Sequence, residues 1–289
     1  MKSNIPVYDL STFEQYKNQG IYIGQFGIYS KIYKQLHATH GHSFYHLVYF
    51  IKGTGKQHID FNTFDIKPGQ IYFMTPGQVH KWTFDTEPDG YIVNFSKEYF
   101  SSFLHKANYL EHFPFFKGTA LSQVISINQS TANKITYLFE EMLNEGSFKP
   151  LHDDDLVRTL LLQLFIYINR TQSLAESKNV NSYNHILLKN FQNLVEVNFK
   201  TSKFPKEYAA LLYITPNHLN ALCKDLVNKS AGQIIRERII LEAKRLLINI
   251  DLSVSQIAEK LNFKDQSYFI KFFKKYEDLT PEKFRKINI

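Results

Sequence analysis

A chain of 289 residues, of which 44% are hydrophobic and 21% charged, is long enough for two globular domains and is not typical of a disordered protein. Its single cysteine, Cys223, excludes a disulfide framework and a cysteine-cluster zinc site within one chain. No apolar run approaches the roughly 18 residues that a membrane span needs, and the N-terminal residues lack the apolar core of a signal peptide. We therefore expect a cytoplasmic protein with no membrane partner.

The net charge of +7 is concentrated in the last third of the chain. Residues 181–289 contain 18 Lys and Arg against 11 Asp and Glu, whereas residues 1–180 contain 16 of each kind. This asymmetry predicts that the C-terminal part binds a polyanion and that the N-terminal part has a different task.

Residues 1–127 are predicted to form an antiparallel β-barrel. Between about Ile21 and Phe95, short apolar and aromatic runs such as HLVYFIKG, QIYFMTPG and YIVNF are separated by turn signals, among them Pro68-Gly69 and Pro76-Gly77. Many short strands joined by close turns are typical of a barrel or sandwich.

Residues 128–170 are predicted to form two amphipathic helices. Apolar residues recur at helical spacing in TANKITYLFEEMLNEG and DDDLVRTLLLQLFIYINRTQSL. The second helix is apolar around much of its circumference and needs cover from two sides, so we expect one side to pack against a second copy of the chain in a homodimer. The polar stretch TQSLAESKNVNS, residues 171–182, is predicted to be the interdomain linker.

Residues 183–289 contain two units of similar design, each with a short helix, a turn and a second helix. FPKEYAALLYITPNHLNALCKDLV forms the first, and Thr215-Pro216 gives its second helix a hydroxyl N-cap followed by proline. LSVSQIAEKLNFKDQSYFIKFFKKY forms the second. A helix of roughly 18 residues, about 27 Å long, is predicted between them. This length suits the presentation of two helices to successive major-groove faces about 34 Å apart.

These C-terminal motifs resemble the double helix-turn-helix domain of AraC-type (AraC/XylS) transcription regulators. The resemblance covers about 100 residues and rests on EYAALLYITPNHLNALCK, RERIILEAKRLL, SVSQIAEKLNF, SYFIKFFKKY and LTPEKFR, in the family's order. Asn228, Asn262 and Asp278 stand where the family usually has glycine after a helix. Because Asn and Asp tolerate the left-handed backbone conformation, we expect the turns to be preserved.

The resemblance, together with helix geometry, places base-reading residues on the second helix of each unit. Asparagine and glutamine suit adenine, lysine suits guanine, and alanine offers only apolar contact. The predicted base-reading residues are Asn217, Asn220, Ala221, Gln266, Ser267, Ile270 and Lys271. The residues predicted to contact phosphates, which position the protein without reading sequence, are Thr215, Lys224, Ser255, Lys274 and Lys275.

The stretch HATHGHSFYH, residues 37–46, and the later PGQVH, ending at His80, resemble the two motifs of cupin barrels. In those motifs a His-x-His-x3-Glu strand and a later histidine can ligate one metal ion, and here His46 replaces the glutamate. On an unbroken strand, His40, His42 and His46 would share one face and His37 would lie on the other. The resemblance implies a double-stranded β-helix.

Three interpretations of these histidines are open. AraC-type regulators with such stretches generally use the barrel as a small-molecule sensor, so the histidines would hydrogen-bond a ligand or complete a polar patch in the barrel interior. Both of these interpretations are favoured over a bound metal cofactor. The candidate pocket residues are His40, His42, His46, Tyr49, Tyr72, His80 and Trp82. Neutral imidazoles can also ligate Zn, Fe, Cu or Ni, and a metal ion would then be held by His40, His42, His46 and His80.

The sequence therefore predicts an α+β protein in which a cupin-like sensor barrel and an all-α double helix-turn-helix domain form a ligand-responsive transcription regulator. The expected partners are double-stranded DNA, a small-molecule effector such as a sugar or other metabolite, a second copy of the chain and RNA polymerase. Activation is the family's commoner output. No catalytic residue is predicted. The alternatives are a metal-dependent cupin enzyme fused to a DNA-binding domain and a ligand-independent dimeric activator.

Overall fold

The computed structural model describes residues 5–13, 20–101, 103, 109–118, 120–145, 153–176, 183–248 and 251–288. The chain divides into two compact units. The N-terminal unit comprises Pro6–Lys178, and the C-terminal unit comprises Asn179–Ile289 together with Met1–Ile5.

The N-terminal unit is built on two five-stranded sheets. One sheet has the order β1 (Val7–Tyr8), β3 (His40–His42), β8 (Val79–Phe84), β5 (Gly55–Ile59) and β6 (Asn62–Ile66). The other has the order β10 (Val124–Ser126), β7 (Gln70–Met74), β4 (Tyr45–Lys52), β9 (Asp89–Phe95) and β2 (Ile21–Gln25). Neighbouring strands are antiparallel, except that β1 runs parallel to β3.

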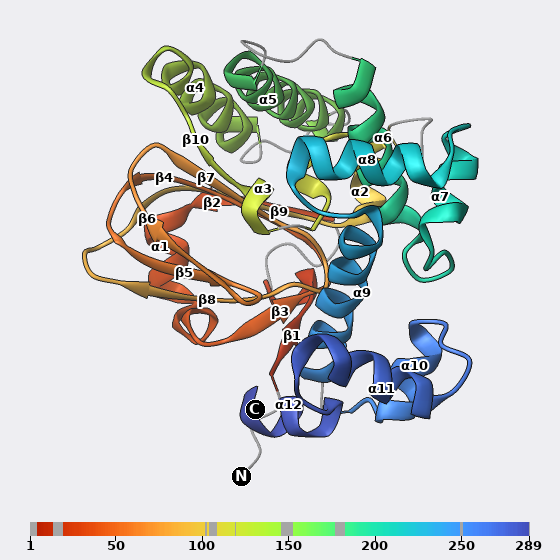
Figure 1. Cartoon of the computed structure of the whole chain (residues 1–289). Helices are drawn as coiled ribbons and strands as arrows, with labels where there is room; N and C mark the ends of the chain where they lie inside the picture. Colours follow the sequence, from red (N-terminus) through yellow and green to blue (C-terminus); the bar gives the residue numbers. More distant parts are fainter. Residues whose placement is uncertain are drawn as a thin grey trace. The chain divides into compact units, whose positions relative to one another are not determined.

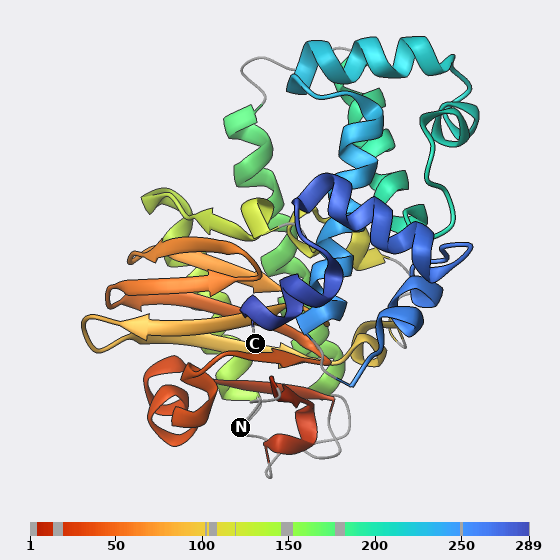
Figure 2. The same cartoon turned by 60° about the horizontal axis from the view of Figure 1, so that its bottom comes forward.

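The two sheets face each other, as Figures 1 and 2 show, and enclose an aromatic core. Side chains from both sheets meet there, including Val48 and Tyr72 from one sheet and Ile59 and Trp82 from the other. The turns at Pro68-Gly69 and Pro76-Gly77 occur as predicted, with Gly69 at φ 82° and Gly77 at φ 86°, values that favour glycine.

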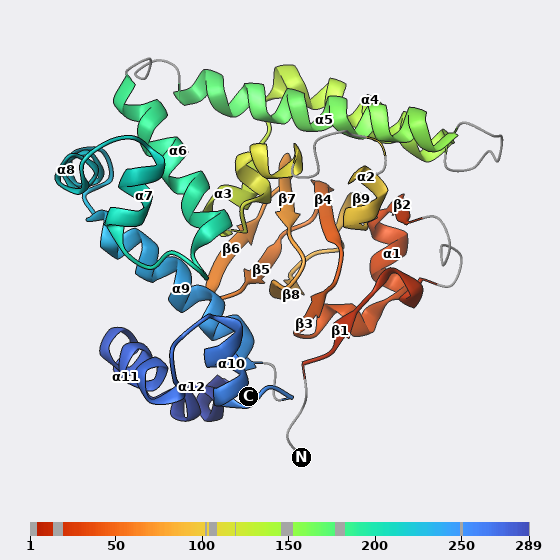
Figure 3. The ribbon, with the colours of Figure 1, turned by 90° about the vertical axis from the view of Figure 1, so that its right-hand side faces the viewer.

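Two long helices cover the outer face of the second sheet (Figure 3). They are α4 (Gln129–Glu145) and α5 (Asp153–Glu176). Phe139 of α4 stacks on Tyr91 and Tyr49 at ring-centroid distances of 5.0 and 5.8 Å. Because both faces of β4 are covered, residues 45–50 of this strand are all buried.

Short elements complete the N-terminal unit. The short α-helices are α1 (Phe26–Ile32), α2 (Lys97–Ser101) and α3 (Ala120–Gln123). The single-turn 3-10 helices are η1 (Leu10–Thr12), η3 (Lys34–His37), η4 (Tyr109–His112) and η5 (Pro114–Phe116).

The C-terminal unit is helical throughout its described elements. These are α6 (Tyr183–Asn198), α7 (Pro205–Leu211), α8 (Pro216–Val227), α9 (Ala231–Ile248), α10 (Val254–Lys260), α11 (Gln266–Glu277) and α12 (Pro281–Asn288), drawn from teal to dark blue in Figure 1. One apolar core joins them and includes the fully buried Cys223. The predicted α+β class, with a β-sheet domain followed by a helical domain, is confirmed.

The predicted start of the linker at residue 171 is wrong. Residues 171–176 continue helix α5, because Thr, Gln, Ser, Leu, Ala and Glu include no helix breaker and the buried turns before them anchor the helix. Residues 177–182, the rest of the predicted linker, lie outside the described residues.

Candidate functional site

The first helix-turn-helix consists of α7 and α8. The Oγ1 atom of Thr215 accepts a hydrogen bond from the backbone nitrogen of His218 at 3.1 Å, which makes Thr215 the N-cap of α8 as predicted. Leu219, Leu222 and Cys223 bury one face of α8 in the core. Burial raises the pKa of the Cys223 thiol to about 11, so this cysteine is a protonated core residue at neutral pH.

The second helix-turn-helix consists of α10 and α11. Asp265 caps α11 by accepting from the backbone nitrogen of Tyr268 at 2.7 Å. Phe269 and Phe273 anchor α11 in the core. Each helix pair thus fixes one face of its second helix and leaves the opposite face in solvent.

The left-handed turns predicted after three helices are confirmed. Asn228, Asn262 and Asp278 have φ values of 53°, 53° and 57°. Asn228 and Asp278 end α8 and α11, and each backbone nitrogen donates to a carbonyl four residues earlier. The glycine-like geometry is therefore kept without glycine.

Most of the predicted base-reading residues lie on the exposed faces of α8 and α11. Asn217 and Ala221 are exposed on α8, and Gln266, Ser267 and Lys271 are exposed on α11. Ile270 is half-buried and packs against the core, which leaves only part of its side chain accessible.

Asn220 has a structural role that its sequence position did not predict. Its Oδ1 atom accepts a hydrogen bond from the backbone nitrogen of Ala231, the first residue of α9, at 3.0 Å. A bidentate contact with adenine uses both the amide oxygen and the amide nitrogen of an asparagine. Asn220 would have to give up this bond to α9 in order to make that contact.

The predicted phosphate contacts are all exposed. Lys224 lies on α8, Ser255 on α10, and Lys274 and Lys275 on α11. Thr215 is exposed, although its hydroxyl oxygen is engaged in the helix cap.

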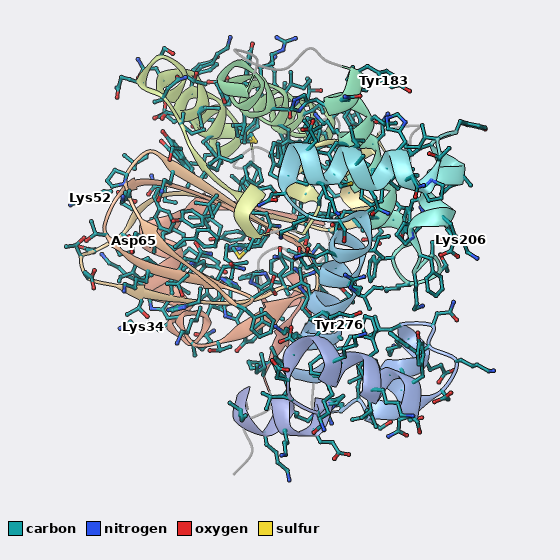
Figure 4. All side chains as sticks on the ribbon, viewed as in Figure 1. Lys34, Lys52, Asp65, Tyr183, Lys206 and Tyr276 are labelled. Carbon is teal, nitrogen blue, oxygen red and sulfur yellow. The ribbon has the colours of Figure 1, made fainter. Side chains whose placement is uncertain are left out.

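Three exposed side chains near the reading helices were not predicted. Tyr213, which is 96% exposed and has a φ of 56°, lies in the turn between α7 and α8, and Tyr268 of α11 is 49% exposed. Lys206 of α7 lies at the periphery of its unit (Figure 4). The position of Tyr213 between a short helix and an N-cap was the available signal for the left-handed turn.

The histidines of residues 37–46 do not lie on one unbroken strand. β3 ends at His42, and β4 begins at Tyr45 in the other sheet, so the chain crosses from one sheet to the other between them. His37 lies in η3, where its Nε2 atom is hydrogen-bonded to the Ser30 hydroxyl at 2.9 Å. The strand prediction was wrong because the barrel corner at residues 43 and 44 interrupts it.

His40, His42, His46 and His80 nevertheless gather in the barrel interior. His40 and His42 come from β3, and His80 from the paired strand β8, where it lies opposite His40 in the register. The Nε2 atom of His42 lies 3.0 Å from that of His40 and 2.8 Å from that of His80. His46 approaches from β4 in the facing sheet, with its ring 4.8 Å from His42 and 5.3 Å from His80.

Burial keeps the four imidazoles neutral. They are between 0 and 2% exposed. Desolvation lowers the pKa of His40 to about 4 and that of His46 to about 3, and it holds the pKa values of His42 and His80 well below the usual range.

The other predicted pocket residues divide between two faces. Trp82 lies against His80 at a centroid distance of 4.9 Å. Tyr72 belongs to the barrel core, where its hydroxyl donates to the Asp65 carbonyl at 3.1 Å. Tyr49 lies on the opposite face of β4, stacked against α4, because side chains alternate along a strand and His46, Val48 and Phe50 take the inner face. The prediction that Tyr49 lines the pocket is therefore wrong.

Comparison with known proteins matches both units. Residues 22–161 match the model of the AraC-like ligand binding domain, and residues 208–287 match a helix-turn-helix domain model. A chain with both is a helix-turn-helix transcription regulator with an N-terminal ligand-binding domain. The chain belongs to the AraC family, as the sequence motifs indicated. No helix in the described part of the chain has the length and apolarity needed to cross a bilayer.

The chain spans between 14% and 56% of the length of three of the curated relatives that it matches. The chain is 30% identical over 111 residues to the uncharacterized HTH-type transcriptional regulator YtdP of Bacillus subtilis, covering 38% of this chain and 14% of that protein. It is 24% identical over 248 residues to the Msm operon regulatory protein of Streptococcus mutans, covering 84% of each. Among solved structures, unsaturated fatty acid-bound ToxT of Vibrio cholerae is 11% identical with a TM-score of 0.39, covering 99% of this chain and 97% of that one.

Proposed function

We propose that the protein is a ligand-responsive, sequence-specific DNA-binding regulator. The observation that carries this proposal is the pair of helices α8 and α11, each buried on one face and exposed on the other with amide, hydroxyl and lysine side chains. The excess positive charge of residues 181–289 supports DNA as the polyanion. The 18-residue helix α9, about 27 Å long, separates the two pairs by a distance suited to adjacent major grooves.

Within this proposal, the reading residues differ in what they can contribute. Asn217 and Gln266 have exposed amides suited to adenine, and Lys271 suits guanine. Ala221, Ser267 and Ile270 offer small or apolar contacts.

Selection of bound DNA from a random pool tests the assignment. We expect Asn217→Ala and Gln266→Ala each to relax the preference at particular positions of the selected site, with a loss of about 1–3 kcal/mol of discrimination. Gln192→Ala, which removes an exposed amide on α6, is the matched control and is expected to keep the parent preference. If both reading-helix variants kept that preference, the assignment would be wrong.

We further propose that the N-terminal unit senses the effector and forms a homodimer through α4 and α5. Tyr137 of α4 and Leu156 of α5 are 56% and 45% exposed, which leaves apolar surface for a second copy. Sedimentation of Leu156→Lys should show a shift toward monomer. Ile28→Lys, on the exposed face of α1, is the matched control and should leave the dimer intact. Equal effects of both variants would contradict this interface.

Activation through RNA polymerase is the output that we propose, because the family resemblance implies it. Transcription from a promoter carrying the selected site, measured with purified polymerase and with and without this protein, tests it. An increase that Gln266→Ala weakens would support activation, and a decrease would overturn it.

A further inference from the structure

We propose that the barrel interior binds one divalent transition-metal ion through the Nε2 atoms of His40, His42 and His80, with His46 at the fourth position, and that this ion is a signal sensed by the protein. The signalling part rests on the proposed regulatory function, and the binding part does not.

The donor geometry is the first support. The ligating nitrogens of His40, His42 and His80 all lie within 4.8 Å of one another, and two of the separations are 3.0 and 2.8 Å. In a tetrahedral site with Zn–N bonds of about 2.0–2.1 Å, any two ligating nitrogens are about 3.3 Å apart. The three imidazoles therefore need only small shifts to surround one ion.

The proton positions are the second support. His40 Nδ1 lies 2.8 Å from the carbonyl oxygen of Ala38, which can only accept, so Nδ1 carries the proton and Nε2 carries the lone pair. This is the arrangement that orients metal-bound histidines. Because the Ala38 carbonyl holds the proton on Nδ1, the lone pair of His40 Nε2 can bind a cation.

A single proton on His42 Nε2 cannot form hydrogen bonds to both His40 Nε2 and His80 Nε2. If His42 Nε2 is protonated, its single hydrogen points at only one of the two nitrogens, at His40 or at His80. If it is unprotonated, its lone pair faces the lone pair of His40 at 3.0 Å. A cation among the three nitrogens removes this conflict, because each then contributes a lone pair to a bond.

His46 supplies the fourth group. Its Nδ1 atom donates to Asn94 Oδ1 at 2.7 Å, which leaves the lone pair on Nε2. That Nε2 atom is buried and has no hydrogen-bond partner among the described residues. His46 stands outside the tight group of three donors, so we assign it to the open position, either as a ligand or as the acceptor of a hydrogen bond from a bound hydroxide.

The donor set defines the class of ion. Imidazole nitrogens suit Zn²⁺, Co²⁺, Ni²⁺ and Cu²⁺, whereas Mg²⁺ and Ca²⁺ require oxygen ligands. Binding of the first group and not of the second is therefore expected.

The single tryptophan provides the measurement. Trp82 is 3% exposed, and its ring centroid lies 4.9 Å from that of His80. Chelator-treated full-length protein is titrated with Co²⁺, while Trp82 fluorescence and the visible absorption of Co²⁺ are followed. We expect saturation at one equivalent, quenching of Trp82, and an absorption spectrum of imidazole ligation that Zn²⁺ displaces and Mg²⁺ does not.

Variants locate the ion. His42→Gln and His80→Gln are expected to weaken Co²⁺ binding at least about 100-fold, and His46→Gln about 10-fold or more. His58→Gln, which changes a histidine on β5 hydrogen-bonded to Thr63 at the barrel surface, is the matched control and should bind as the parent does. If the buried variants fail to fold, the wild-type Co²⁺ spectrum and the Trp82 quenching decide the matter. Absence of binding by wild-type protein, or binding unchanged in folded His42→Gln, would overturn the site.

A DNA-binding titration with and without one equivalent of Zn²⁺ separates the two parts of the proposal. A change in DNA affinity of about tenfold or more, absent in His42→Gln, supports sensing. Metal binding with unchanged DNA affinity overturns sensing and leaves the site standing. Failure to bind DNA in either state would contradict the proposed regulatory function, while the Trp82 titration still tests the metal site.

Discussion

The side-chain oxygen of Asn220 accepts a hydrogen bond from the backbone nitrogen of Ala231, joining the reading helix α8 to the start of α9. The first backbone N–H groups of a helix have no partner within the helix, so Asn220 acts as a cap from a distance of 11 residues. This amide therefore adds a polar link between α8 and α9 to the apolar core that the two helices share.

Asn220→Ala is expected to lower the free energy of unfolding by about 1 kcal/mol, as the loss of a helix cap does. Asn217→Ala, which alters an exposed amide on the same helix, is expected to change it by less than about 0.5 kcal/mol. Chemical denaturation of the full chain measures both, and equal losses would contradict the distinction drawn between the two asparagines.

Tyr213→Gly should stabilise the protein. Tyr213 is 96% exposed and has a φ of 56°, so its side chain contributes little burial while its backbone adopts a conformation unfavourable for L-residues. The left-handed conformation costs about 1–2 kcal/mol and glycine's extra freedom in the unfolded chain costs about 0.5–1 kcal/mol, so a net gain of about 0.5–1 kcal/mol is expected. Leu211→Gly, two residues earlier within α7, should instead destabilise by about 1 kcal/mol. Denaturation midpoints that move the same way in both variants would rule out this account of the turn.

The affinity for DNA should fall steeply as salt concentration rises, because lysines that contact phosphates displace counterions. Lys274→Gln and Lys275→Gln should each reduce the slope of log affinity against log salt by about 1. Lys52→Gln, on the exposed end of β4 in the N-terminal unit (Figure 4), is the control and should leave the slope unchanged. Fluorescence anisotropy at several salt concentrations measures the slopes. A flat dependence for the parent protein would count against phosphate contacts altogether.

Without metal, the N-terminal unit should lose stability as the pH falls from 7 to 5. The folded-state pKa values of His40 and His46, about 4 and 3, lie below the ordinary histidine value. The unfolded chain therefore binds more protons over this range, and stability rises with pH. From an unfolded pKa of about 6.5, each such histidine should contribute about 2 kcal/mol of loss. Unfolding in the presence of chelator at both pH values measures this loss. The control is His218→Gln, which removes an exposed histidine of α8, and this variant should show the same loss of stability as the parent protein. Equal stability at pH 7 and pH 5 would show that the imidazoles are not held neutral.

The turns and caps of the C-terminal unit were predictable because they depend on neighbours within a few residues. Thr215 caps α8, and Asn228, Asn262 and Asp278 adopt the left-handed conformation, each as its local sequence indicated. The role of Asn220 was not predictable in this way, because its partner lies on another helix.

In the N-terminal unit, periodicity predicted strands and turns but not which strand belongs to which sheet. The corner at residues 43 and 44 divides the histidine stretch between two sheets. Helix α4 covers the outer face of β4, so Tyr49 packs against this helix and not inside the barrel. Neither fact has a signal within a short window of sequence.

By itself the sequence determined the family, the order of a β-sheet domain and a double helix-turn-helix domain, and the conformations set by local backbone and side-chain chemistry. The cupin resemblance named His40, His42, His46 and His80 as one possible set, but only the tertiary structure decided which of their nitrogen atoms meet in the barrel. His42 and His80 are 38 residues apart, and their contact exists because β3 pairs with β8 in one particular register. A shift of that register by one residue would turn one side chain of the pair to the other face of the sheet, so long-range strand pairing sets this cluster.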